Sequence, residues 1–149
     1  MKTVQIRDSD RSGCLEVSFE DVLRIVLPIW KGRSWRLLEM EAVSSGEINV
    51  AAIEAQLSDS PGGIEYSGPD LMTLALGLFQ EINLVACVPV DDRRLPRFPM
   101  DEDYYRSVEL SLMCHDSDLW EIVTSSEVAH ARIRERFRDV EIHSGLPEH

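Results

Sequence analysis

Acidic side chains in two short stretches are the residues of this sequence best suited to surface chemistry. Carboxylates form strong charge-assisted hydrogen bonds with lysine and arginine, and aromatic rings beside them can serve as contact anchors. Segment 91–106 carries both residue types, and the polar turn 116–118 carries two further acids. We therefore expect a partner-binding surface formed by Asp91, Asp92, Asp101, Glu102, Asp103, Tyr104 and Tyr105, with Asp116 and Asp118 as secondary contacts.

Further acids come from stretches predicted to be strands of the same sheet, namely Glu39, Glu41, Glu109 and Glu121. The sequence leaves open whether these residues share one face. If they do, their negative potential would steer a basic protein toward that face and raise the association rate. The alternative interpretation is that the acids only provide solubility and that the aromatic residues belong to the core.

Residue spacing argues against catalytic and metal-binding chemistry. His115, Asp116 and Asp118 lie close together in the sequence, but no second histidine or cysteine stands at the spacing of a zinc site. Cys114 and His115 are neighbours on a predicted strand, so their side chains point to opposite faces. Neither a G-x-S-x-G elbow nor a phosphate-binding glycine loop is present. The sequence thus predicts no catalytic residue, no metal site, no cofactor and no enzymatic activity.

Two rival functions remain open at this point. A small enzyme or ligand-binding domain would have its pocket beneath segment 91–106 and would use Arg93, Arg94 or Arg97 to hold an anionic metabolite. A homo-oligomeric structural module would instead pair through the edge of an apolar C-terminal strand. Segment 91–106 is the only long irregular stretch, and such loops are usually functional or mobile.

The charge balance restricts the kinds of partner. The 149 residues include 27 acidic and 15 basic side chains, for a formal net charge of −12. A chain this acidic repels nucleic-acid phosphates and anionic membrane surfaces, so we expect a basic protein partner and neither of those two. The three cysteines are widely spaced, and no apolar stretch of signal-peptide length is present, which favours a reduced, cytoplasmic protein. The oligomeric state does not follow from the sequence.

The elements that must position these residues follow from the spacing of apolar side chains. Alternation predicts strands at 3–7, 14–18, 35–43, 64–66, 84–90, 107–115, 119–124 and 140–142. Helical spacing predicts helices at 19–27, 50–57, 69–82 and 127–136. Sequential hairpins with unevenly interspersed helices predict a single α+β domain over residues 1–149, with a mostly antiparallel sheet and about four helices packed against it.

The segment from Val108 to Val140 combines an alternating apolar strand with a polar turn, a second strand and a helix. Its central run is Asp116-Ser117-Asp118-Leu119-Trp120-Glu121-Ile122, and its helix ends near Phe137-Arg138-Asp139-Val140. This pattern, which covers under a third of the chain, resembles the C-terminal part of immunity proteins from bacterial polymorphic toxin systems. The resemblance implies a small, acidic, cytoplasmic α+β protein that binds and blocks a co-encoded toxin domain.

Overall fold

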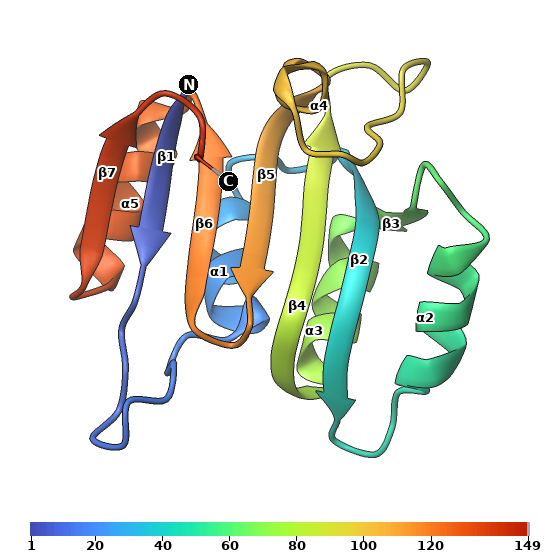
Figure 1. Ribbon diagram of the computed structural model, residues 1–149, viewed down its shortest axis with the longest axis horizontal. Helices are drawn as coiled ribbons and strands as arrows, with labels where there is room; N and C mark the ends of the chain where they lie inside the picture. The colour runs from blue at the N-terminus through green and yellow to red at the C-terminus, as the bar shows by residue number, and fades with distance from the viewer. Residues whose placement is uncertain (149) are drawn as a thin grey trace.

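Seven strands form one sheet in the order β3-β2-β4-β5-β6-β1-β7, and every neighbouring pair is antiparallel (Figure 1). The structure, a computed structural model, describes residues 1–148. The strands are β1 (Lys2–Ile6), β2 (Ser34–Ser44), β3 (Ile64–Ser67), β4 (Leu78–Pro89), β5 (Val108–His115), β6 (Leu119–Thr124) and β7 (Val140–Ser144). The chain therefore inserts its first strand between the last two.

The helices are α1 (Phe19–Val26), α2 (Val50–Ser58), α3 (Gly68–Leu76), α4 (Glu102–Arg106) and α5 (Glu127–Arg136). In Figure 1, α1, α3 and α5 lie behind the sheet, and α2 flanks its β2–β3 end. The expected α+β fold with a mostly antiparallel sheet is confirmed. About four helices were expected, and the additional one is α4. It lies within segment 91–106, which the sequence predicted to be irregular throughout. No helix among the described residues has the length and apolar character needed to cross a membrane.

Side-chain caps determine where the helices begin. At α1, Ser18 Oγ accepts a hydrogen bond from the Asp21 N–H (3.1 Å), and the Asp21 carboxylate accepts one from the Ser18 N–H (3.0 Å). Ser67 caps α3, Asp101 caps α4 and Ser126 caps α5, each through a side-chain oxygen. These helices therefore start where a side chain satisfies a backbone N–H that would otherwise lack a partner.

The larger core lies between the sheet and α1, α3 and α5. Trp120 on β6 is fully buried there, and its ring stacks on that of Phe19 in α1 with centroids 5.8 Å apart. The Trp120 Nε1–H donates a hydrogen bond to the Val17 carbonyl oxygen (2.9 Å). One side chain thus connects β6 both to α1 and to the segment that precedes it.

A second, smaller core lies on the other side of the sheet, beneath α4. Its buried members are Leu38, Val85, Cys87, Tyr104, Tyr105, Val108, Met113 and Val123. Because side chains alternate along a strand, Val85 points away from the larger core, to which its neighbours Leu84 and Ala86 belong. We call this side of the sheet, opposite to α1, α3 and α5, the open face. Helix α4 covers one end of it.

The strand expected at 14–18 is absent, and this expectation was wrong. The segment forms only an isolated bridge between Ser9 and Leu15. A further strand beside β1 has no place to pair, because β6 and β7 already occupy both edges of β1.

The helix expected over 69–82 was too long, because α3 ends at Leu76 and Leu78 already belongs to β4. Gly77 lies at the junction, where a Cβ atom would collide with the side chain of Ile48. β4 pairs with both β2 and β5, and this tertiary pairing overrides the local helical spacing of apolar residues.

Candidate protein-binding surface

A row of side chains crosses six strands on the open face of the sheet. The registers of five adjacent strand pairs place in one row Glu39, Val85, Met113, Glu121, Gln5 and Glu141. Directly opposed residues share a face, and neighbouring strands lie about 4.8 Å apart, so the row spans about 24 Å. Carboxylates occupy the middle of the row and both of its ends.

The acids on this face of the sheet differ in their exposure. Glu39 and Glu41 on β2 are exposed, and Glu41 Oε1 accepts a hydrogen bond from Asn83 Nδ2 (3.4 Å). Glu141 on β7 is also exposed, and its Oε2 lies 3.2 Å from His143 Nε2. In Figure 1 no helix lies in front of β2 or β7, the two strands that carry these acids. The exposed carboxylates are therefore accessible to a partner.

Glu121, in the middle of the row, is buried (5 % exposed) but well partnered. Its carboxylate accepts a hydrogen bond from Gln5 Nε2 (3.0 Å), and its Oε1 lies 2.7 Å from His115 Nε2. Burial, together with the nearby Glu121 carboxylate, raises the pKa of Tyr105 to about 12. The Glu121 side chain is thus held beneath the surface by Gln5 and His115, and Tyr105 stays a neutral phenol at physiological pH.

The sequence left open whether Glu39, Glu41 and Glu121 share a face, and the strand registers show that they do. Glu109 does not join them, because its Oε2 is bound by Trp30 Nε1 (3.2 Å) and by Arg33 Nη1 (2.7 Å) at one end of the sheet. Sequence reasoning missed Glu141. The alternation of the final strand was visible, but which strand it would join was not.

The expected acids of segment 91–106 are exposed. Asp101 accepts a hydrogen bond from the Tyr104 N–H (3.1 Å) and so caps α4. Glu102 and Asp103 lie 3.1 Å and 3.7 Å from guanidinium nitrogens of Arg106. Exposed ion pairs of this kind contribute little to stability, so these carboxylates can exchange Arg106 for a partner's cation. Asp91 and Asp92 are exposed in the preceding loop.

Tyr104 and Tyr105, expected to be contact anchors, are buried instead (2 % and 3 % exposed). Their rings meet edge to face with centroids 5.0 Å apart, and the Tyr104 hydroxyl lies 2.6 Å from the Ser111 hydroxyl. The Tyr105 hydroxyl donates to Met113 Sδ (3.7 Å). In this structure the two tyrosines fasten α4 to the sheet and do not present their rings to a partner.

Asp116 and Asp118 lie at the far end of the sheet from α4. They belong to the turn between β5 and β6, where Asp116 and Ser117 adopt positive φ angles of 49° and 55°. The eight residues of β5 separate this turn from α4, a distance of about 27 Å along an extended strand. The structure does not bring the two expected acidic groups together, and the row of the open face lies between them.

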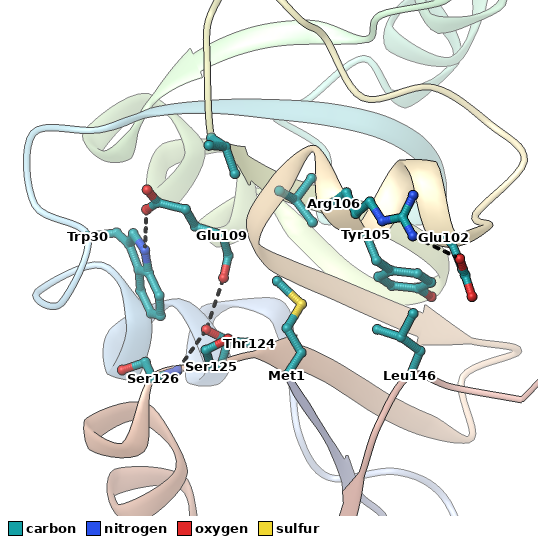
Figure 2. A pocket seen from close by; sticks show the side chains of 12 residues that line it. Met1, Trp30, Glu102, Tyr105, Arg106, Glu109, Thr124, Ser125, Ser126 and Leu146 are labelled. Carbon is teal, nitrogen blue, oxygen red and sulfur yellow. Dashed lines mark hydrogen bonds and ion pairs between the residues drawn. The ribbon is translucent and has the colours of Figure 1, made fainter.

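A pocket with a volume of about 810 Å³ lies beside α4, at one end of the sheet (Figure 2). We call it the Trp30–Tyr105 pocket. Its remaining lining residues are Met1, Val90, Glu102, Arg106, Val108, Glu109, Thr124, Ser125, Ser126 and Leu146. Figure 2 shows Glu102 and Arg106 on one side of it and Ser125 and Ser126 on the other. Apolar and aromatic walls with a few polar groups are typical of ligand pockets.

The polar groups of this pocket are held by one another. The Thr124 hydroxyl donates to the Glu109 carbonyl oxygen (2.9 Å) and accepts a hydrogen bond from the Ser126 N–H (3.2 Å). The lining contains neither histidine nor cysteine, so a nucleophile activated by an adjacent histidine is not part of it. The arrangement is suited to binding.

A smaller hollow of about 250 Å³ lies in segment 91–106 itself. Arg94 and Arg97, two of the three arginines expected to hold an anion, line it together with Asp101 and Asp103. Arg93 is not among the lining residues. The two carboxylates offset the two guanidinium groups, which weakens the hollow as an anion site.

The buried cysteines are unreactive in the folded chain. Burial raises the pKa of Cys87 and of Cys114 to about 12. Both therefore remain thiols at neutral pH, whereas the thiolate is the nucleophile and the metal ligand. Within residues 1–148, no three or more histidine, cysteine, aspartate or glutamate side chains are grouped so as to hold a metal ion.

Comparison with known proteins found no family model, curated protein or solved structure that matches this chain.

Proposed function

We propose that this chain is a non-catalytic binding protein, most concretely a bacterial immunity protein that neutralises a cognate toxin domain in the cytoplasm. Its acidic surface consists of Glu39, Glu41 and Glu141 on the open face together with Glu102 and Asp103 on α4. The observation that carries the proposal is the placement of these exposed carboxylates on one side of the sheet, with Glu39, Glu41 and Glu141 on strands to either side of the part that α4 covers.

The chemistry of this surface fits a basic partner. Lysine and arginine form their strongest hydrogen bonds with carboxylates, and a toxin that handles nucleic acid needs such cations to hold phosphate. Complementary charge also raises the association rate, which matters for an inhibitor that must reach its toxin before damage occurs. The resemblance of residues 108–140 to immunity proteins supports this particular class of binding protein.

The proposal is tested with the toxin domain encoded beside this chain. Reversing two charges in Glu39→Arg/Glu41→Arg should weaken binding about 100-fold, because like charges then face each other across the interface. Titration calorimetry measures the dissociation constant, and survival of cells that co-express both proteins reports neutralisation. Glu102→Arg/Asp103→Arg is the matching variant on α4 and leaves the Asp101 cap intact.

A control must make the same charge change elsewhere. Glu47 precedes α2 and Glu135 lies on α5, and both are exposed and away from the open face. Glu47→Arg/Glu135→Arg should keep wild-type affinity within about threefold, since net charge alone changes only long-range steering. Equal loss of affinity in this control and in Glu39→Arg/Glu41→Arg, or no loss in either, would contradict the proposed surface.

A second candidate function, binding of a small ligand, is favoured by the Trp30–Tyr105 pocket. Its volume of about 810 Å³ lies within the range of small-molecule sites, and its walls are largely apolar. Arg106 at its rim suits a ligand that joins an apolar body to an anionic group.

This candidate predicts a ligand-dependent rise in the melting temperature. A panel of aromatic and aliphatic carboxylates, each at 100 times its dissociation constant, would stabilise the fold by about 2.7 kcal/mol if bound only to the native state. Ser125 lies at the exposed rim of the pocket, so Ser125→Trp places an indole in the pocket. This variant should abolish the rise in melting temperature. The absence of any response in the wild-type chain would remove this candidate.

A further inference from the structure

The sheet ends in two edge strands, and they differ in how well they are covered. β3 has four residues, and α2 flanks that end of the sheet, whereas β7 has five residues and is the outermost element on its side in Figure 1. An uncovered edge presents backbone N–H and C=O groups that can pair with another strand.

The β1–β7 ladder determines which backbone groups of β7 point outward. At its two ends, the Arg7 N–H donates to the Asp139 carbonyl oxygen (3.0 Å) and the Gly145 N–H donates to the Met1 carbonyl oxygen (3.2 Å). Hydrogen-bonded and non-hydrogen-bonded pairs alternate along an antiparallel ladder. The odd-numbered residues of β7 therefore turn toward β1, and the N–H and C=O groups of Val140, Ile142 and Ser144 point away from the sheet.

We propose that β7 pairs with β7 of a second copy of this chain, antiparallel and with Ile142 opposite the partner's Ile142. In this register all three outward-facing residues of each copy fall in hydrogen-bonded pairs. Val140 lies opposite the partner's Ser144, and the three pairs exchange two hydrogen bonds each, six in all. The two sheets then continue as one across a two-fold axis.

Side-chain complementarity selects the same register. Glu141 and His143 occupy the non-hydrogen-bonded positions between these pairs, where opposed side chains approach most closely. With Ile142 on the axis, Glu141 faces the partner's His143, and the reverse contact forms once more by symmetry. Within one chain Glu141 Oε2 already lies 3.2 Å from His143 Nε2, so these two groups are compatible neighbours. An axis through Glu141 or His143 would instead oppose identical side chains and is disfavoured.

The side of the β7 edge that faces α5 is also compatible with pairing to a second copy. A hollow of about 390 Å³ lies between α5 and β7, lined by Ile142 and Ser144 and, on α5, by Glu127, Ala131 and Arg134. The two-fold axis places the α5 helices of the two copies on the same side of the joined sheet, with opposite directions. The half-buried Ile142 side chains meet beside this hollow, so apolar area is removed from water at the centre of the contact.

A two-fold contact of this kind closes on itself. Each copy uses its β7 edge once, and the remaining edges are the short β3 strands beside α2. Pairing therefore stops at the dimer and does not continue into a fibre.

The test is the sedimentation behaviour of the chain alone, without any toxin, so that its result does not depend on the proposed function. We expect a reversible monomer–dimer equilibrium between about 1 μM and about 1 mM. His143→Glu opposes like charges and should raise the dimer dissociation constant at least about tenfold. The swap Glu141→His/His143→Glu restores the glutamate–histidine contacts between the two copies and should recover dimerisation.

Two further variants distinguish a specific effect on β7 pairing from a general effect of substitution in an edge strand. Ile142→Pro removes one outward N–H without touching the β1–β7 hydrogen bonds and should also favour the monomer. Glu65→Gln on β3 should leave the equilibrium unchanged. Circular dichroism confirms that each variant is folded. A wild-type chain that stays monomeric at about 1 mM overturns the proposal. A dimer whose dissociation constant is unchanged by His143→Glu also overturns it.

Discussion

Replacing Trp120 with alanine should lower the free energy of unfolding by about 4 kcal/mol. The side chain is fully buried, stacks on Phe19 and donates a hydrogen bond to the Val17 carbonyl oxygen. Its removal leaves a large cavity at the junction of β6 and α1 and deprives a buried acceptor of its donor. Because domains of this size are stable by only about 5–15 kcal/mol, the loss is a large fraction of the total.

The loss is measured by chemical denaturation followed by circular dichroism, since the substitution also removes a fluorophore. Trp120→Phe keeps an aromatic ring against Phe19 but lacks the N–H, so it should cost less, about 1–3 kcal/mol. A loss below about 1 kcal/mol for Trp120→Ala would show that the larger core does not depend on this contact.

Tyr104→Ala should cost about 3 kcal/mol and should release α4 from the sheet. The ring is 2 % exposed and belongs, with that of Tyr105, to the part of the five-residue α4 that is buried in the smaller core. A helix this short has little stability of its own, so it depends on this anchor. Tyr104→Phe keeps the packing but leaves the buried Ser111 hydroxyl without its partner and should cost about 1–2 kcal/mol.

Denaturation measures both substitutions, and amide hydrogen exchange at residues 102–106 reports the release of α4. We expect fast exchange there in Tyr104→Ala and wild-type protection in Tyr104→Phe. If α4 stays protected in Tyr104→Ala, then Tyr105 alone holds it, and the role assigned here to Tyr104 is wrong.

The sequence predicted the elements well where a regular pattern of apolar residues extends over many positions. The β5–β6 hairpin and helices α1, α2 and α5 lie close to their expected positions, because each has a regular apolar pattern or a side-chain cap. Helix α4 was missed because five residues contain too little periodicity to be recognised. The end of α3 was missed because the apolar residues after Gly77 fit a helix and a central strand equally well.

The sequence contained an indication that Tyr104 and Tyr105 would be buried. The run 84–90 was expected to be a central strand, and an uninterrupted apolar strand needs cover on both faces. Val85 and Cys87 point to the open face, so some apolar group had to cover them there. The two adjacent tyrosines of segment 91–106, which follows directly, were candidates for that cover.

The acidic row could be predicted only in part. Alternation along residues 35–43 places Glu39 and Glu41 on one face, but the alignment of Glu39 with Glu121 and Glu141 depends on the order and register of six strands. Register shifts between β2 and β4 alter that alignment by a residue at several points. Such shifts arise from packing in three dimensions and have no signature within one strand.

The position of β1 in the sheet has a consequence for how the chain folds as it is made. β1 is synthesised before the other strands of the sheet, but its two neighbours, β6 and β7, are the last strands of the sheet to be made. β1 must therefore remain without its partners until β6 and β7 have been made, and this half of the sheet assembles only then. Pairing between such distant segments slows folding and leaves the unpaired β1 segment open to premature aggregation in the meantime.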